Sequence, residues 1–389
     1  MEPSPPPAKL PRRVRWMRRV RRITVAAAAM VAFLAVGAGA APAASMGSAD
    51  AGTLVVGATD AGAFSFGSEP GGAIDRVVAI SIDGLRADAL TVLGEAGTPN
   101  IHRLIREGAS TLNARNLVEV TVTLPNHTAM VTGQRADRDA GGTGVTFNAD
   151  NGRTVHELAG RYVASVFDVV HDAGGSTGLY VGKIKFDFLD RSWNGDNGAP
   201  DTVGADDGRD KITVYVRSTS AGATEALTQQ LTSQSPFAFS FLHLPQPDSA
   251  GHVSRWMSPR YLAAVEQADQ LVGEVLAAID SSPERTADTA VILTTDHGGY
   301  REGHSDPTRL ETYRIPFVVW GPGVAAGTDL YDLNPLNRLD PGETRPGYAV
   351  VQPVRNGELA NLATDLLDLP AVPGSRFDQA HDLNVLPLD

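Results

Sequence analysis

The sequence predicts an α/β domain in which a single doubly wound, mostly parallel sheet is flanked by helices. Three observations lead to this prediction: apolar runs of strand length recur along the chain, segments with helical spacing lie between them, and no repeat or second domain boundary interrupts the series. Strands that alternate with helices are typical of parallel sheets, because parallel neighbours need a long crossover that is usually a helix. The chain has 389 residues, of which 42% are hydrophobic, and this is enough for one large domain.

The predicted strands are continuous apolar runs, as expected for strands that are buried on both faces of a sheet. The first run is VVAISID at 77–83, which ends in an aspartate. Similar runs follow at 177–183, 237–244, 290–296 and 315–321. Together they predict the central strands of the sheet.

Helices are predicted between these strands, where apolar residues recur at helical spacing. The segments are 98–108, 154–174 and 258–280. Two long segments, 190–211 and 322–350, lack such a pattern. Loops of that length in a compact domain are usually lids or binding loops, or else plain surface insertions, and their shape would decide which substrates are accepted.

The amino-terminal 44 residues have the organisation of a secretion signal. A basic block at 11–22 precedes the apolar run ITVAAAAMVAFLAVGAGA, and the tripeptide APA then provides a small-residue cleavage pattern. We therefore expect a signal peptide at 1–44 and a secreted or extracytoplasmic protein. The alternative is an uncleaved membrane anchor, because the 22 uncharged residues at 23–44 are enough to span a bilayer.

Two further segments complete the expected organisation. Residues 45–74 are rich in Gly and Ala and are interpreted as a linker, with a short strand at 54–57. The change from a Gly- and Ala-rich composition to an apolar run near residue 75 predicts that the folded domain occupies 75–389.

Charge and cysteine content exclude several kinds of function. The chain has no cysteine, which excludes disulfides, thiolate metal sites and a cysteine nucleophile. The whole chain carries a formal charge of −12 and residues 1–22 carry +7, so the rest carries −19. No binding to nucleic-acid duplexes is expected of so acidic a body, and membrane contact is expected only through export or the amino-terminal anchor.

Asp and His residues gather where the predicted strands end. The carboxyl ends of parallel strands meet at one edge of the sheet, where ligands bind. Carboxylate and imidazole ligands in such a group suit Zn²⁺ and accept Mn²⁺, Fe or Co²⁺, and their number is enough for two ions. Taken singly, each residue could instead form a turn or a helix cap. The candidate metal ligands are Asp83, Asp248, His252, Asp296, His297 and His304.

A candidate nucleophile lies in VEVTVTLPNHTAMVTG at 118–133, where an apolar run precedes a helix-like segment. Thr123 is expected at the turn from strand to helix, with its hydroxyl near a helix N-terminus that favours anions. The alternative is that Thr121 and Thr123 are ordinary strand residues and that Asn126 or His127 caps the helix.

These motifs resemble the alkaline phosphatase superfamily and, within it, the type I phosphodiesterase/nucleotide pyrophosphatase family. The family has a metal-binding Asp before Gly, a Thr nucleophile in T-[hydrophobic]-P-N-H, then P-D-x-x-G-H and D-H-G. This chain has SIDGLRAD, TLPNH, PDSAGH and DHGG in the same order, and the similarity covers about 76–385. The resemblance implies an alkaline phosphatase-like fold, an exported bacterial hydrolase of phosphate esters and a catalytic domain at 75–389.

The resemblance also implies roles for individual residues. It implies that one zinc is held by Asp83, Thr123, Asp296 and His297. The second is held by Asp248, His252 and one further histidine, either His304 in DHGGYREGH, which we favour, or His381 near the chain end. Asn148 matches an Asn that hydrogen-bonds a phosphate oxygen in the family, although Thr143 stands where the family has His.

Lys183 and Lys185 are two of only four lysines, and they lie at a predicted strand end. A similar K-x-K resembles phosphonoacetate hydrolases of this superfamily, where such lysines hold an anionic group of the substrate. The alternative is a solvated edge of the sheet. The other histidines, His243 among them, are interpreted as packing or surface residues.

The most favoured function is therefore a phosphodiesterase/nucleotide pyrophosphatase with Thr123 as the nucleophile, a threonyl-phosphate intermediate and two zinc ions. Its partners would be small phosphate esters or phosphonates. A phosphomonoesterase, a phosphonoacetate-type C–P hydrolase and an exported binding protein on a retired phosphatase scaffold are the alternatives. A sulfatase is disfavoured, because the chain has no Cys and TLPNH lacks the Arg of the sulfatase motif.

Overall fold

The computed structural model describes residues 74–204, 206 and 208–388. The predicted signal peptide at 1–44 lies outside the described residues, and so does the predicted linker at 45–74 apart from Ile74. No helix in the described ranges has both the length and the apolar character that a membrane crossing requires.

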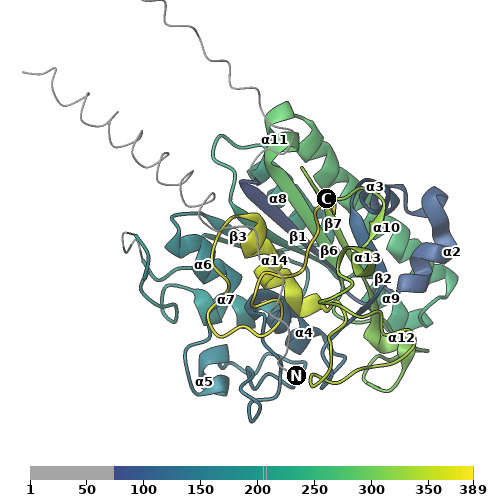
Figure 1. The fold of residues 1–389 in the computed structure, drawn as a ribbon, viewed down its shortest axis with the longest axis horizontal. Coiled ribbons are helices and arrows are strands. Elements are labelled where there is room, and N and C mark those ends of the chain that lie inside the picture. Colours follow the sequence, from purple (N-terminus) through teal and green to yellow (C-terminus); the bar gives the residue numbers. More distant parts are fainter. Residues whose placement is uncertain (1–73, 205, 207, 389) are drawn as a thin grey trace, which may run out of the picture. The chain divides into compact units, whose positions relative to one another are not determined.

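An eight-stranded sheet forms the centre of the described domain (Figure 1), with the strand order β4-β3-β5-β1-β6-β7-β2-β8. Neighbouring strands are parallel except where β7 pairs antiparallel with β6 and with β2. The strands are β1 (Arg76–Ile82), β2 (Ala109–Arg115), β3 (Thr177–Val181), β4 (Val214–Arg217), β5 (Phe239–Leu244), β6 (Thr289–Thr294), β7 (Arg314–Trp320) and β8 (Thr328–Asp329). The predicted α/β class with one mostly parallel sheet is confirmed.

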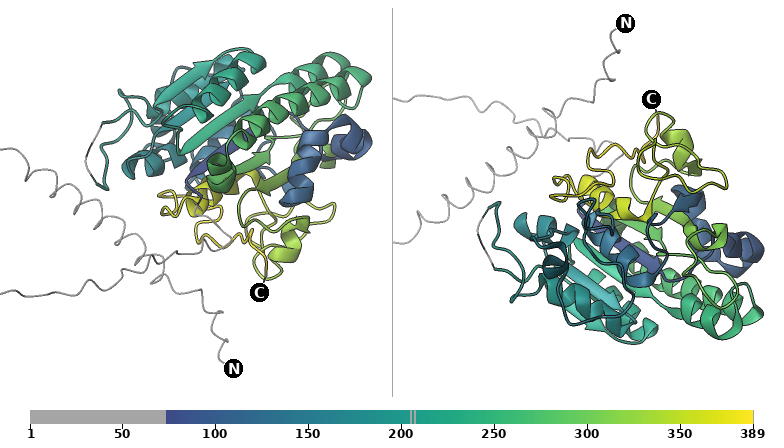
Figure 2. Two further views of the ribbon diagram at one scale, coloured as in Figure 1. Left: turned by 90° about the horizontal axis from the view of Figure 1, so that it is seen from above. Right: turned by 90° about the horizontal axis from the view of Figure 1, so that it is seen from below.

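Helices cover both faces of the sheet, as Figure 2 shows. They are α2 (Ala87–Gly97), α3 (Pro99–Glu107), α4 (Thr123–Thr132), α5 (Val155–Ala159), α6 (Val166–Asp172), α7 (Asp187–Trp193), α8 (Ser220–Leu231), α9 (Gln246–Ser254), α10 (Pro259–Asp280), α11 (Pro283–Asp288), α12 (Leu310–Tyr313), α13 (Leu330–Leu333) and α14 (Leu359–Leu366). Two short 3₁₀ turns, η1 (Ile184–Phe186) and η2 (Asn356–Glu358), complete the list.

Alternate residues of β1 enter two different cores. Val77 and Ala79 pack in the core that α4, α6 and α14 cover. Val78 and Ile80 pack in the opposite core, beneath α3, α8 and α10. Because successive side chains of a strand point to opposite faces, a central strand with helices on both sides must be apolar throughout. This is why β1 reads as one uninterrupted apolar run.

The predicted helix at 154–174 is wrong in one respect, because it is two helices, α5 and α6. Gly160 ends α5 with a φ of 70°, a left-handed conformation that glycine adopts without steric cost. Ser165 and Asp168 then form a capping box that starts α6. The apolar spacing continues across the break because both helices bury their apolar residues in the same core.

Other differences from the predicted elements concern edges and loops. The apolar run at 118–122 forms no strand, whereas β2 and β4 were not predicted. The segment 190–211 begins inside α7, and the segment 322–350 contains β8 and α13. β4 is a short strand at the edge of the sheet, and β2 lies next to the two-residue edge strand β8. Both strands are only partly buried, so their sequences lack the continuous apolar signal of a central strand.

Candidate functional site

The register of the central strands brings the candidate residues to one edge of the sheet. Ser81 of β1 pairs with His243 of β5 and with Thr294 of β6. Asp83 therefore leaves β1 at the level where Asp296 follows β6 and where α9 begins after β5. Parallel pairing thus explains why residues far apart in sequence meet at the carboxyl end of the sheet.

Gly84 allows the two nearest of these segments to touch. The N–H of Asp248 donates to the carbonyl of Asp83 at 3.0 Å. A Cβ on Gly84 would lie 2.9 Å from the Cα of Asp248, and Gly84 has a φ of 73°. Both the left-handed backbone and the close approach require glycine at this position.

Each of the three aspartates has one carboxylate oxygen held by donors. Asp83 Oδ2 accepts from Lys183 Nζ at 2.7 Å, and Asp248 Oδ2 accepts from the same ammonium at 2.6 Å. Asp296 Oδ1 accepts from the backbone N–H groups of Gly84 and of residue 297 at 3.1 and 2.9 Å. Donors on one oxygen fix the plane of the carboxylate and turn its other oxygen toward the site.

The second oxygen of each carboxylate is buried and accepts no hydrogen bond. These atoms are Oδ1 of Asp83, Oδ1 of Asp248 and Oδ2 of Asp296. Buried polar atoms are almost always hydrogen-bonded, so three such oxygens in one place indicate a site built for a ligand outside the chain. A metal cation is the ligand that suits anionic oxygens of this kind.

Three histidines turn the same nitrogen toward these oxygens. In each, Nδ1 lies 2.7–2.8 Å from a backbone carbonyl oxygen, which can only accept, so Nδ1 carries the proton. The carbonyls belong to Glu302 for His252, to Gly298 for His297 and to Thr121 for His304. Nε2 is therefore the nitrogen of each ring that can bind a metal ion when it carries no proton, an arrangement typical of metal-binding histidines.

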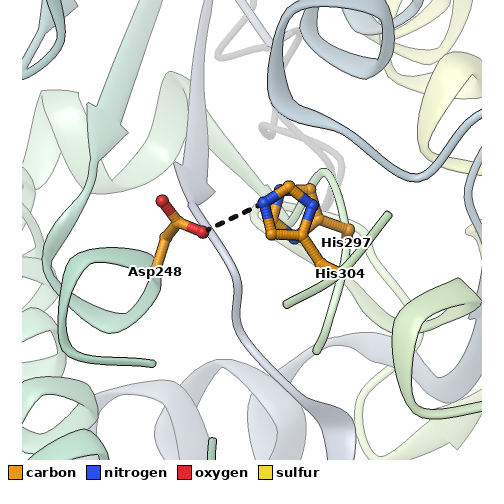
Figure 3. A group of neighbouring side chains, drawn as sticks. All are labelled: Asp248, His297 and His304. Atoms are coloured by element: carbon orange, nitrogen blue, oxygen red, sulfur yellow. Dashed lines mark ion pairs between the residues drawn. The ribbon is translucent and has the colours of Figure 1, made fainter. Parts of the chain in front are cut away.

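The ligand atoms form two groups that share His297. One group is Asp83, Asp296 and His297, and the other is Asp248, His297 and His304, with the ligand atoms of each group within 4.8 Å of one another. Figure 3 shows the second group, in which the rings of His297 and His304 stack face to face. His252 adjoins it, with Nε2 at 3.3 Å from Asp248 Oδ1. Both groups fit metal ions.

The charged side chains of the site shift one another's pKa values. Burial and the Asp296 carboxylate raise the pKa of Asp83, but Lys183 and His243 outweigh them and hold it below its usual range. Burial lowers the pKa of His297, but Asp296 opposes burial and raises that pKa to about 9. A metal ion bound through His297 must therefore displace a proton, so metal binding is expected to weaken as the pH falls.

Thr123 is the first residue of α4, and its Oγ1 lies 3.5 Å from His297 Nε2. Its hydroxyl therefore faces the nitrogen that both metal groups share. Asn148 lies beside it, because Asn148 Oδ1 accepts from the N–H of Leu124 at 3.1 Å and from Lys185 Nζ at 3.0 Å. The N–H after Thr123 is thus bonded to Asn148.

His381 lies away from these groups. Its Nε2 is 3.1 Å from Thr364 Oγ1 on α14, and its Nδ1 is 3.4 Å from an Asp365 oxygen. The structure therefore places His304, and not His381, among the other candidate ligands.

The sequence assigns no functional role to two residues that lie at the site, His243 and His127, the latter considered only as an alternative helix cap. His243, interpreted as a packing or surface residue, is buried and bonds Asp83. His127 lies one helical turn after Thr123, where its Nδ1 donates to the Thr123 carbonyl at 2.8 Å and its Nε2 lies 2.8 Å from Ser81 Oγ. Its spacing of four residues from Thr123 within a predicted helix was a usable signal, whereas His243 is one polar residue in an apolar strand and carried none.

A family model described as "Type I phosphodiesterase / nucleotide pyrophosphatase" matches residues 77–314, which is more than half of the chain. Among curated proteins, GPI ethanolamine phosphate transferase 1 of Neurospora crassa is 37% identical over 113 residues, or 28% of this chain. That match spans only 10% of the transferase. The chain therefore covers about a tenth of the length of this relative.

Two solved structures have the same fold. Murine ectonucleotide pyrophosphatase/phosphodiesterase 5, in an inactive form in complex with AMP, superposes with a TM-score of 0.56 at 15% identity, covering 80% of this chain and 100% of that one. The human protein of that name superposes with a TM-score of 0.55 at 14% identity and with the same coverage of both chains. At these identities the likeness concerns the fold.

Proposed function

Since the chain belongs to the type I phosphodiesterase/nucleotide pyrophosphatase family of the alkaline phosphatase superfamily, we propose that it hydrolyses phosphodiesters at a two-zinc site with Thr123 as the nucleophile. The observation that carries the proposal is the convergence of three buried carboxylate oxygens without hydrogen bonds on the Nε2 atoms of three histidines, beside the Thr123 hydroxyl. Phosphate esters are the substrates that the family implies.

The proposed ligands divide between two ions. Asp83, Thr123, Asp296 and His297 would hold one ion, and Asp248, His252 and His304 the other. Bound there, the ions supply Lewis acidity that lowers the pKa of the Thr123 hydroxyl and offsets negative charge on the phosphoryl group and on the leaving oxygen. Mn²⁺, Fe or Co²⁺ would also be compatible with these ligands.

Thr123 Oγ1 attacks phosphorus, an Oγ–P bond forms, and one ester P–O bond breaks. The leaving alcohol takes up a proton, and a threonyl-phosphate ester remains on Thr123. Water then attacks phosphorus from the opposite side, and the P–Oγ bond breaks to restore the hydroxyl. The position of Thr123 at the N-terminus of α4 supports this role, because helix N-termini favour negative charge.

Asn148 is proposed to hold a non-bridging phosphate oxygen. Its Oδ1 already accepts from Leu124 N–H and Lys185 Nζ. The amide orientation is therefore fixed, and the Nδ2 donor is the group left for substrate. Preorganised donors of this kind stabilise the charge that develops in a transition state.

The positions of the two lysines favour an ester over a phosphonate. Lys183 Nζ already contacts Asp83 and Asp248, and Lys185 Nζ contacts Asn148. A carboxylate of phosphonoacetate would have to compete with these partners for either ammonium. We also propose that residues 1–44 direct export of the protein and that nucleotides and phosphoethanolamine-containing diesters are substrates to test, as the names of the similar proteins suggest.

The test is hydrolysis by the purified, zinc-loaded full chain of bis-p-nitrophenyl phosphate, p-nitrophenyl phosphate and phosphonoacetate side by side. Preference for the diester supports the proposal, and a chelator should abolish that activity until zinc is restored. Preference for the monoester or the phosphonate would contradict the proposed substrate class while keeping the metal site. Two bound zinc ions with no hydrolysis would indicate a narrower substrate, whereas no zinc and no hydrolysis would favour an exported binding protein.

A further inference from the structure

His243 is a buried histidine to which the proposed reaction assigns no step. It lies on β5, one residue before the strand ends, and it has no solvent exposure. Its Nε2 lies 2.9 Å from Asp83 Oδ2. Its Nδ1 lies 3.4 Å from the N–H of Gly182, which can only donate. Nδ1 is therefore the acceptor, and Nε2 carries the proton that is donated to Asp83.

Packing fixes the direction of this hydrogen bond. The His243 ring lies 4.3 Å from the Phe186 ring and 5.1 Å from the His127 ring, measured between ring centroids. All three side chains are fully buried. An imidazole enclosed in this way cannot change rotamer without displacing its neighbours, so its Nε2–H stays directed at Asp83.

As a result, one oxygen of Asp83 accepts two hydrogen bonds and the other accepts none. Oδ2 receives two donors, Nε2 of His243 and Nζ of Lys183. Oδ1 is buried, accepts no hydrogen bond, and lies 3.7 Å from His297 Nε2. Two donors on one oxygen stop the carboxylate from rotating, so only Oδ1 is presented to an ion.

We infer that His243 is a positioning residue of the metal centre that fixes Asp83 as a one-oxygen ligand. This inference rests on the proposed metal-dependent function. It concerns the group of Asp83, Asp296 and His297. At Asp248, by contrast, Oδ2 accepts from Lys183, and the neighbouring His252 and His304 face the other oxygen, Oδ1. Removal of the His243 donor should therefore lower the affinity for the ion at this group more than the affinity for the other ion.

The experiment measures zinc affinity by competition with a chromophoric chelator on the purified full chain. The variants are His243→Phe, which keeps a ring but has no donor, and His243→Gln, which places an amide N–H near the position of Nε2. His102→Phe is the matched control, because His102 lies on α3 and bonds Thr98. Loss of a partner that orients a metal ligand typically lowers metal affinity by about 10–100-fold.

In His243→Phe, one zinc affinity should fall by about 10–100-fold while the other changes by less than about threefold. His243→Gln should regain most of the loss, and His102→Phe should match the wild type. At saturating zinc, the kcat of His243→Phe on the diester should return toward that of the wild type, and KM for the diester should be unchanged. This result is expected for a residue that acts through the metal.

Unchanged affinities in His243→Phe, or an equal loss at both zinc sites that His243→Gln does not restore, would overturn the inference and leave the proposed function standing. A wild-type chain that binds no zinc would overturn the proposed function together with the inference.

Discussion

The Nε2 atoms of His252 and His304 lie 3.2 Å apart, although 52 positions separate these residues in the chain. His252 projects from α9, and His304 lies in the loop that follows β6. The Nδ1 atom of each ring is held by a backbone carbonyl, so the Nε2 atoms of both rings face Asp248 Oδ1, at 3.3 and 3.7 Å. Their approach places two imidazole nitrogens beside the Asp248 carboxylate, where together they could hold a metal ion.

We predict that His304→Ala lowers the zinc content of the protein from about two ions per chain toward one. The physical reason is that His304 Nε2 lies 3.7 Å from Asp248 Oδ1 within the second metal group. Elemental analysis after dialysis measures the change. His381→Ala is the control and should leave the zinc content unchanged, because His381 bonds Thr364. The opposite ranking of the two variants would show that the wrong histidine was chosen.

We predict that Thr123→Ala lowers kcat on a diester by about 10³-fold or more, because the variant lacks the oxygen that forms the covalent intermediate. Zinc content should change little, since Asp83, Asp296 and His297 remain. Thr123→Ser is the control, because it keeps a hydroxyl in the same place and should retain measurable turnover. If Thr123→Ala kept most of the activity, Thr123 would be excluded as the nucleophile.

We predict that Asn148→Ala and Lys185→Met each lower kcat/KM by about tenfold and that the double variant loses little more. The effects should not add, because Lys185 acts by holding Asn148 Oδ1 at 3.0 Å. Steady-state kinetics on the two single variants and the double variant measure the coupling. Additive losses would instead mean that Lys185 contacts the substrate independently, as in the phosphonoacetate hydrolases it resembles.

We predict that Asp378→Asn stabilises the protein at alkaline pH. Burial and the nearby Glu358 carboxylate raise the pKa of Asp378 well above its ordinary value of 3.8, and Arg338 opposes this only in part. A carboxyl whose native pKa is raised binds its proton more tightly in the folded state, so stability is lost as the pH rises through the native pKa. Asparagine removes the buried charge, keeps an acceptor for the backbone N–H groups that bond Asp378, and tolerates the φ of 52°.

Urea denaturation of wild type and Asp378→Asn at about pH 5 and about pH 8 tests this prediction. The variant should be more stable than the wild type at the higher pH, and the difference between the two proteins should be smaller at the lower pH. Asp332→Asn, which changes an exposed carboxylate on α13, is the control and should show no such difference. A variant less stable than the wild type at both values would contradict the assigned pKa direction.

Some of the fold and site could be predicted because the signals are local. The central strands read as apolar runs because both faces of β1, β5 and β6 are covered by helices. The candidate ligands Asp83, Asp296 and His297 directly follow such runs, so the topology of a parallel sheet was enough to predict that they meet. The break between α5 and α6 was missed because apolar spacing outweighed Gly160 and the capping box in the prediction.

The fold class, the family and the kinds of side chain at the site could all be inferred from short motifs and from periodicity, which are local properties of the chain. Which atoms face the site depends on the folded arrangement of the strands and of the loops that follow them. His243 and Lys183 both donate to Asp83 Oδ2, although they lie 160 and 100 positions from Asp83 in the chain. His243 lies on β5, and Lys183 follows β3. Such contacts follow from strand register and from packing at the edge of the sheet. Both depend on how several distant segments are arranged, so no single segment predicts them.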